Sequence, residues 1–229
     1  MNELKHTERE MLMLKEELND MWKRVLSQLE KSKQAFLNDD IELSREIVSR
    51  EKRVNAFELK IDSDCENYIA LFSPVAIDLR LTLSIIKISN TLERIGDFAA
   101  GVARHVIDND CNGLEDQLVE DLQIEYMFDT LISMLSDGFI ALESENTKIS
   151  GKIIGKDEIV DEIYHNAFGV LTDYAHNNPS FVHCALKLLL LIRKLERIGD
   201  HCSNIVEEIV FYVDAKVLKH AGKTKNITK

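Results

Sequence analysis

Residues that break helices are scarce in this chain, which has two prolines and nine glycines among its 229 residues. An all-β fold needs a turn about every 8–12 residues, and alternating βαβ units need glycine-rich loops. The sequence has too few turn residues for either class. Apolar residues instead recur at helical spacing almost throughout, and this pattern predicts an all-α fold.

Positive charge and long apolar runs are also in short supply. Acidic residues outnumber basic ones by 40 to 28, which gives a formal net charge of −12. Proteins that bind nucleic acid usually have a basic face, and anionic lipid would repel this chain. No apolar run is longer than that of residues 188–192, which is too short to span a bilayer, and the N-terminus lacks the apolar region of a signal peptide. We therefore expect a cytoplasmic protein with no nucleic-acid ligand and no membrane insertion.

Enzyme motifs and closely spaced cysteine pairs are missing as well. The sequence contains no P-loop, no Rossmann glycine pattern and no nucleophile elbow. We therefore expect no enzymatic activity and no catalytic residues. Four cysteines are present without a CxxC pair, so we expect reduced thiols at all of them. These cysteines are Cys65, Cys111, Cys184 and Cys202.

The apolar pattern divides into six long segments of helical period. Ser73 and Pro74 are predicted to open the third helix, because serine is a good N-cap and proline fits the first helical turn. Helices of this length, about 45 Å at 1.5 Å per residue, with short loops, predict two antiparallel three-helix bundles lying side by side. The helices are expected at residues 4–36, 41–71, 74–107, 114–142, 149–176 and 179–213.

One hexapeptide, LERIGD, occurs twice, at residues 92–97 and 195–200. A repeat of this length is expected by chance about 0.001 times in a chain of this size. Pro74 precedes the aspartate of the first copy by 23 residues, and Pro179 precedes that of the second by 21. The two halves therefore share one layout. A tandem duplication predicts two repeats of three helices each, at residues 1–112 and 113–229.

Each copy of the hexapeptide carries an acidic pair with i,i+4 spacing, Glu93/Asp97 in the first half and Glu196/Asp200 in the second. Residues at this spacing share one helix face, and about seven acidic pairs are expected from composition alone. The repeated pairs differ from that background because like charges and a mid-helix glycine both destabilise a helix. Both occur twice, in apolar surroundings. The glycines, at positions 96 and 199, should let a neighbouring helix approach closely.

A second set of polar residues with the same spacing lies on each preceding helix. Two such pairs facing each other would form a site rich in oxygen ligands. These ligands suit iron, manganese, magnesium or calcium, and zinc is less favoured without paired Cys or His. The alternative is a salt-bridged bundle edge with nearby arginines. The candidate metal ligands are Glu196, Asp200, Asp157 and Asp161 in the second half and Glu93, Asp97, Glu51 and Asn55 in the first.

The sequence resembles the PhoU family, whose members carry an E/D-x-x-x-D signature within an ERIGD string in each half. Residues 74–80 match the family pattern PVAxDLR, and residues 157–161 match DxxVD. Residues 196–207 are close to ERIGDHxxNIxE. The resemblance covers essentially the whole chain. It departs at Asn55, where an acid is usual, and in the second half, which lacks PVAxDLR.

The resemblance implies tandem three-helix bundles with metal sites at the acidic pairs, occupied by iron, manganese, magnesium or another divalent ion. It implies negative regulation of phosphate uptake and of phosphate-starvation signalling through the Pho regulon. The implied partners are the ATPase subunit of the phosphate ABC transporter and a PAS-containing sensor histidine kinase. Homodimers are common in the family. The surface that would bind these partners is not identified by the sequence.

Two other functions are compatible with the residues themselves. A helical bundle with long exposed faces can act as a scaffold without metal. A ferritin-like, carboxylate-bridged storage protein or oxidase would use ExxH motifs, of which the chain has Glu162/His165 and Glu3/His6. The second motif lies in a polar terminal segment, which argues against a buried two-metal centre. His201 follows Asp200 by one position, about 100° around the helix, and should not share its face.

Overall fold

The computed structural model describes residues 6–108, 111 and 114–217, and these form long helices with no strand among them. Two short 3₁₀ turns, Thr147–Ile149 and Pro179–Phe181, precede the last two helices. No helix in the described part of the chain has an apolar stretch that could cross a bilayer. The α-helices are α1 (His6–Leu37), α2 (Ile41–Phe72), α3 (Ala76–Asp108), α4 (Asp116–Asp121), α5 (Ile124–Glu143), α6 (Ser150–Asn177) and α7 (Val182–Asp214).

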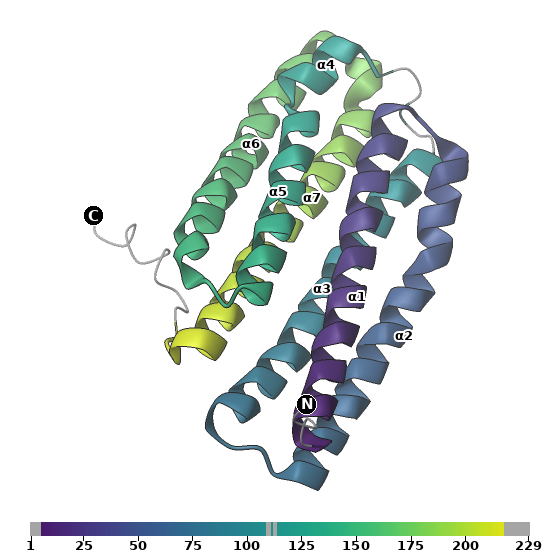
Figure 1. Cartoon of the computed structure of the whole chain (residues 1–229). Helices are drawn as coiled ribbons and strands as arrows, with labels where there is room; N and C mark the ends of the chain where they lie inside the picture. Colours follow the sequence, from purple (N-terminus) through teal and green to yellow (C-terminus); the bar gives the residue numbers. More distant parts are fainter. Residues whose placement is uncertain (1–5, 109–110, 112–113, 218–229) are drawn as a thin grey trace.

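The helices form two antiparallel three-helix bundles that lie side by side, as predicted (Figure 1). Helices α1, α2 and α3 make one bundle, and α5, α6 and α7 make the other. Helices α3 and α7 pack against each other where the bundles meet, and most of the buried apolar residues of the six long helices belong to one cluster. The predicted division between residues 112 and 113 lies outside the described residues and stays a prediction.

Trp22 of α1 packs and hydrogen-bonds across the interface between the two bundles. Its ring is fully buried, and its indole N–H donates a hydrogen bond to the carbonyl oxygen of Leu135 in α5 at 3.1 Å. The ring lies directly over Gly138, where a Cβ would come within 3.2 Å of it. Because a large side chain from one half fills space in the other, the position of α5 depends on α1.

Two predicted helix boundaries are wrong. Ser73 does not begin the third helix: it ends α2 in the left-handed conformation (φ 46°), and its N–H donates to the Ile69 carbonyl at 3.1 Å. The last carbonyls of a helix need such partners, and a residue in this conformation supplies one. The predicted fourth helix is also divided, because Gln123 has a φ of 51° between α4 and α5. The break lets Leu118 of α4 stay buried in the core.

The expectation of four reduced thiols is wrong for one pair. Cys111, in the connection between α3 and α4, forms a disulfide with Cys184 in the first turn of α7, with 5.3 Å between their Cα atoms. The two residues are 73 positions apart in the sequence. They meet only because α7 runs back along α3, so no sequence spacing could reveal the pair. Cys65 and Cys202 are free and buried, in agreement with the expectation.

The repeated glycines lie in the middle of α3 and α7 at close contacts between helices, as predicted. A Cβ at Gly96 would lie 3.4 Å from a methyl carbon of Val54 in α2. A Cβ at Gly199 would lie 3.3 Å from a methyl carbon of Val160 in α6 and 2.6 Å from Oδ1 of Asp157. The corresponding helices of the two halves therefore cross at corresponding residues, which is expected of a duplication.

We predict that Gly199→Leu lowers the free energy of unfolding by about 1–3 kcal/mol, because the added side chain overpacks the contact between α6 and α7. Gly155 of α6 is the matched control, since nothing lies within 4 Å of a Cβ built there. Gly155→Leu should leave stability equal or slightly higher, because leucine favours a helix over glycine. Denaturant unfolding of both variants measures the difference. A Gly199→Leu variant as stable as the parent protein would contradict the close contact.

Candidate functional site

The second bundle brings its four predicted carboxylates together on facing turns of α6 and α7. Asp157 and Asp161 come from α6, and Glu196 and Asp200 come from α7. Burial raises the pKa of Asp157 to about 6, and the negative charges of Asp161, Asp200 and Glu196 add to that shift. A hydrogen bond from a serine acts in the opposite direction. The charges of the other three carboxylates therefore act on Asp157, which places the two pairs near each other across α6 and α7.

Asp157 is the most deeply held of the four. Its Oδ2 atom accepts a hydrogen bond from the Ser203 hydroxyl at 2.8 Å. Its Oδ1 atom is buried without a hydrogen-bond partner and lies over Gly199, in space that a Cβ would fill. A buried carboxylate oxygen without a partner is unfavourable unless a cation or a donor compensates it. Ser203 was missed by the sequence analysis, although it lies one turn before Glu207 on the same helix as the predicted ligands.

Glu196 and Asp200 complete this cluster from α7. Burial raises the pKa of Glu196, with the charges of Asp200 and Asp161 as the next causes, although Arg197 and Arg193 oppose the shift. Arg197 stands 3.9 Å from a carboxylate oxygen of Asp200, too far for a strong hydrogen-bonded pair. The alternative function of these carboxylates, a bundle edge held by salt bridges to arginine, therefore rests on a weak ion pair at Asp200.

The first bundle has the same arrangement on α2 and α3, with one clear difference. Burial raises the pKa of Asp97, and the negative charge of Glu51 adds to it, whereas Arg104 lowers it. Burial is also the largest cause that raises the pKa of Glu93, followed by the negative charges of Asp97 and Glu58. Arg104 forms an ion pair with Glu51. The residue seven positions after the repeat aspartate is thus an arginine in this half and a glutamate, at position 207, in the other.

Asn55 lies one turn after Glu51 on α2, the helix that packs against α3. Its amide oxygen and Oδ1 of Asp97 are both buried without a hydrogen-bond partner. Both clusters therefore offer unpartnered oxygen atoms, from carboxylates alone in the second half and from a carboxylate and an amide in the first. Oxygen donors of this kind suit hard cations such as magnesium and manganese.

The carboxylate and amide oxygens are chemically suited to bind a metal ion, but their side chains do not converge on one position in this structure. Within residues 6–108, 111 and 114–217, no three His, Cys, Asp or Glu side chains are close enough to hold an ion between them. The second cluster has the stronger case of the two. It carries four carboxylates, and the ion pair that occupies Glu51 in the first cluster has no equivalent at Asp157.

Two of the histidines named in the sequence analysis adjoin residues of the second cluster, His201 in sequence and His165 through a backbone contact. His201 is buried between the bundles, where its ring stacks on Phe98 with 5.7 Å between centroids. Burial lowers its pKa to about 4, so the ring is neutral near pH 7. His165 is exposed on α6, with Nδ1 2.6 Å from the Asp161 carbonyl oxygen. His6 packs edge-on against Phe72, and Glu3 lies outside the described residues.

Comparison with known proteins gives matches in both halves of the chain. The family model described as "PhoU domain" matches residues 18–106 and again residues 124–209. The phosphate-specific transport system accessory protein PhoU of Edwardsiella tarda is 33% identical over 188 residues, which are 82% of this chain and 76% of that protein. The PhoU homolog of Aquifex aeolicus is 31% identical over 206 residues, which are 90% of this chain and 92% of that protein.

A solved structure has the same fold over nearly its whole length. The crystal structure of PhoU from Pseudomonas aeruginosa superposes with a TM-score of 0.85 and is 28% identical, covering 91% of this chain and 99% of that one. The two domain matches each contain one LERIGD repeat and the helix that faces it. The duplicated acidic clusters thus lie within the matched regions, and the chain belongs to the PhoU family.

Proposed function

We propose that this protein is a cytoplasmic regulator of phosphate transport that binds metal ions and works as an adaptor. It would link the ATPase subunit of a phosphate ABC transporter to a PAS-containing sensor histidine kinase, and restrain phosphate uptake and starvation signalling when phosphate is plentiful. Relatives named as accessory proteins of the phosphate-specific transport system support the role in transport. None of these names describes an enzyme.

The observation that carries the metal-binding part is the unpartnered, buried Oδ1 atom of Asp157 among three further carboxylates. Asp157 and Asp161 of α6, with Glu196 and Asp200 of α7, would hold the ion. A bound divalent cation would supply positive charge to groups that repel one another. Asp157 would be positioned by Ser203 and given room by Gly199. The first cluster, with Asn55 and the Glu51–Arg104 pair, would bind more weakly because it carries less negative charge.

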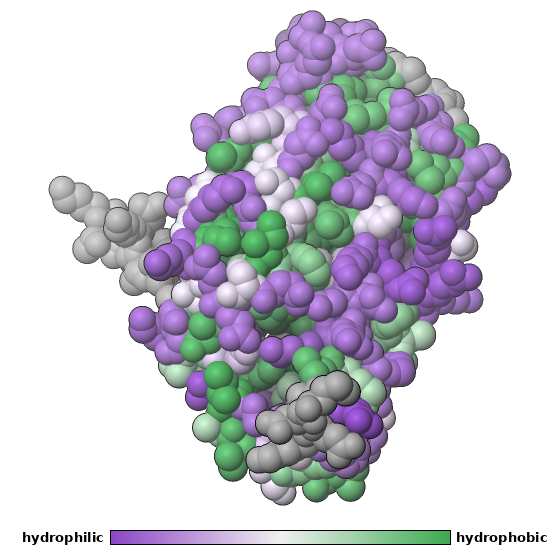
Figure 2. Space-filling model, in the orientation of Figure 1, coloured by the Kyte–Doolittle hydropathy of each residue, from purple (hydrophilic) through white to green (hydrophobic). Residues whose placement is uncertain are grey.

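The adaptor part is supported by the shape and charge of the surface. The long helices of two bundles present wide faces that suit partner helices rather than a small substrate. Most of the face in Figure 2 is hydrophilic, and hydrophobic side chains gather at its lower end, where α2 meets α3. Leu71 in the last turn of α2 and Val75 in the connection are 76% and 74% exposed. A net charge of −12 disfavours operator DNA, so an effect on transcription would pass through protein partners. A homodimer would use the same surfaces.

A metal-independent scaffold is the alternative, and the two functions differ in one measurement. A metal-binding regulator retains divalent metal after desalting and is stabilised by it, whereas a scaffold is indifferent to metal. The arginine near Asp200 and the ion pair at Glu51 are the features that favour the scaffold, since they compensate carboxylates without a metal.

We predict that a divalent metal stabilises the parent protein and that the double variant Asp161→Asn/Asp200→Asn loses this effect. A ligand at 100 times its dissociation constant adds about 2.7 kcal/mol to the free energy of unfolding. The variant replaces one carboxylate on each of the two facing helices with an amide of the same shape. Thermal unfolding by calorimetry, with manganese or magnesium and with a chelator, measures the shift.

The matched control is Glu158→Gln/Glu162→Gln. Both residues are exposed on α6 at the same i,i+4 spacing and next to the candidate ligands, so this variant removes the same charge from the same region. It should keep the full metal-dependent shift. If the two double variants respond to metal alike, the assignment of the ligands is wrong.

In cells, deletion of this protein should raise the expression of phosphate-starvation genes in phosphate-rich medium. Additional deletion of the cognate sensor kinase should abolish that rise, because the adaptor acts through the kinase. Reporter expression in the single and double deletion strains measures the effect. A rise that persists undiminished without the kinase would refute the adaptor and favour a separate scaffold or metal-storage role.

A further inference from the structure

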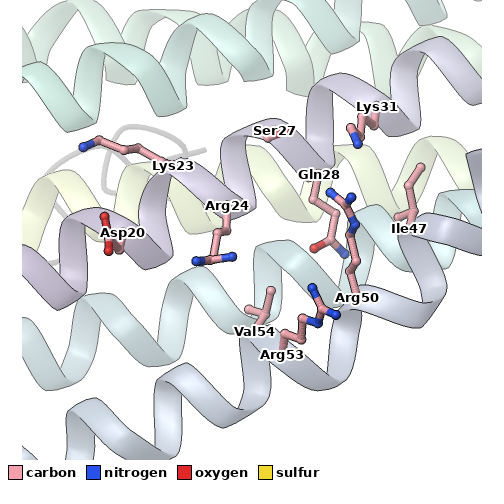
Figure 3. Close-up of a pocket in the computed structure, with 10 residues that line it drawn as sticks. All are labelled: Asp20, Lys23, Arg24, Ser27, Gln28, Lys31, Ile47, Arg50, Arg53 and Val54. Carbon is pink, nitrogen blue, oxygen red and sulfur yellow. The ribbon is translucent and has the colours of Figure 1, made fainter.

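A groove of about 360 Å³ between α1 and α2 has a charge opposite to that of the rest of the molecule (Figure 3). Ten residues line it, and one of them, Asp20, is acidic. In the whole chain acidic residues outnumber basic ones by 40 to 28, so the groove inverts the overall balance. The five basic residues that line it are Lys23, Arg24, Lys31, Arg50 and Arg53.

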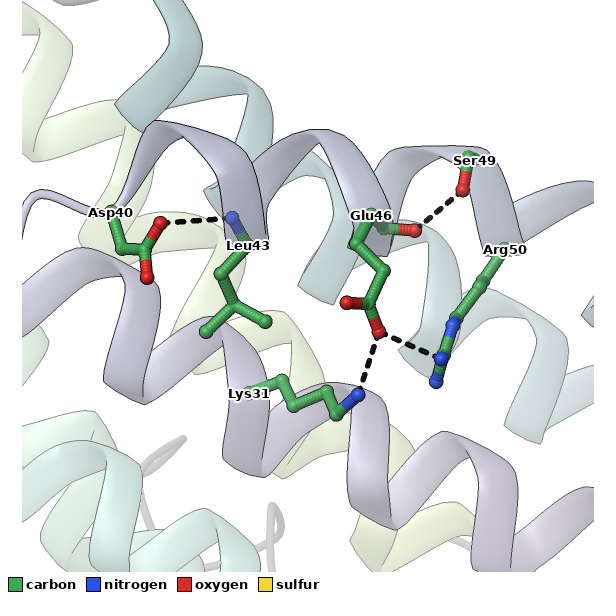
Figure 4. Close-up of polar contacts among 6 residues, drawn as sticks. All are labelled: Lys31, Asp40, Leu43, Glu46, Ser49 and Arg50. Atoms are coloured by element: carbon green, nitrogen blue, oxygen red, sulfur yellow. Dashed lines mark hydrogen bonds and ion pairs between the residues drawn. The ribbon is translucent and has the colours of Figure 1, made fainter.

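Part of this positive charge is already compensated. Lys31 and Arg50 both contact one carboxylate oxygen of Glu46, each at 2.7 Å (Figure 4). Lys31, its strongest partner, holds the pKa of the Glu46 carboxyl below its ordinary value. The five basic residues that line the groove outnumber the two acidic ones, Asp20 and the neighbouring Glu46, by three.

The remaining cations of the groove form no ion pair within the described part of the chain. The Arg24 guanidinium stands 4.8 Å from the centroid of the Phe57 ring. Arg53 is exposed on α2. Figure 3 shows Arg24 of α1 and Arg50 and Arg53 of α2 pointing into the space between the two helices, whereas Lys23 points away from α2. Three arginines from two helices therefore converge on one space.

The floor of the groove is fixed by the core. Gln28 is 5% exposed, and its amide N–H donates a hydrogen bond to the Gly96 carbonyl oxygen of α3 at 3.1 Å. Val54 lies beside it and contacts Gly96 as well, and Ile47 is also buried. A concave site with an apolar floor and a few convergent polar groups is typical of a preformed site for a small molecule.

We propose that this groove binds a small anion that carries two or more phosphoryl groups, held chiefly by Arg24, Arg50 and Arg53. The planar guanidinium group matches phosphoryl oxygens in two-point contacts, which a lysine does not provide. The basic residues of α1 extend from position 24 to position 31, about 10 Å along the helix axis, which is longer than one phosphoryl group. A single phosphate would therefore engage only part of the groove.

A small ligand fits the surroundings better than a long polyanion or an acidic protein segment. Asp20 lies at one end of the groove and Glu46 flanks the other, so a chain of negative charges that continued past either end would meet a carboxylate. The net charge of −12 repels such a chain further. The site is also separate from the adaptor function proposed above, because binding requires neither a protein partner nor a metal at the acidic clusters.

The test is isothermal titration of the full, chelator-treated chain with three probes: inorganic phosphate, pyrophosphate and ATP. We expect saturable binding of one equivalent of pyrophosphate or ATP, at least tenfold tighter than that of inorganic phosphate. Affinity should fall as salt is raised. Equal affinities for pyrophosphate and ATP assign the site to an inorganic phosphoryl chain, and tighter binding of ATP assigns it to a nucleotide.

Two charge-matched double variants locate the site. Arg24→Gln/Arg53→Gln should weaken binding at least tenfold. Arg45→Gln/Lys52→Gln, which removes the same charge from exposed positions of α2 outside the groove, should change it less than threefold. Circular dichroism melting checks that both variants are folded. The proposal is overturned if no probe carrying two or more phosphoryl groups binds saturably, if inorganic phosphate binds as tightly as pyrophosphate and ATP, or if both variants weaken binding equally.

Discussion

Helices α6 and α7 approach so closely at Gly199 that the Asp157 carboxylate lies in space that any other side chain would fill. This contact explains most of the candidate site. It withdraws Asp157 from water, leaves one of its oxygens without a partner and raises its pKa to about 6. Glycine is unfavourable in the middle of a helix, and like charges one turn apart repel. The first feature is explained by the room that the glycine makes for a carboxylate, and the second is what the proposed cation would compensate.

The two halves have kept this contact but differ in how the negative charge is compensated. In the first half Val54 packs on Gly96 as Val160 packs on Gly199. Asn55 then stands at the place of Asp161, and Arg104 at the place of Glu207. The first cluster is therefore less negative and already contains a cation, which binds Glu51. The two halves therefore share the packing geometry of the repeat and differ in its electrostatics.

The basic groove and the first acidic cluster both border the same turn of α3, at Gly96 and Asp97. Gln28 and Val54 form the floor of the groove, and both contact Gly96, the residue before Asp97. A basic surface and an acidic one thus approach the same turn of α3 in a chain whose net charge is −12. Because both surfaces rest on rigid, packed helices rather than on loops, their charged groups are held in place at little entropic cost.

The sequence by itself determined the helical class, the two bundles, the duplication and the facing acidic pairs, because each follows from periodicity or from a repeat that is local in the chain. Tertiary structure decided the rest. Ser73 could begin one helix or end another, and the carbonyls at the end of α2 settled which. Cys111 meets Cys184 across 73 residues only when α7 packs on α3. Arg24 lies on α1, and Arg50 lies 26 positions later on α2. The orientation of each helix about its axis decides whether these side chains converge.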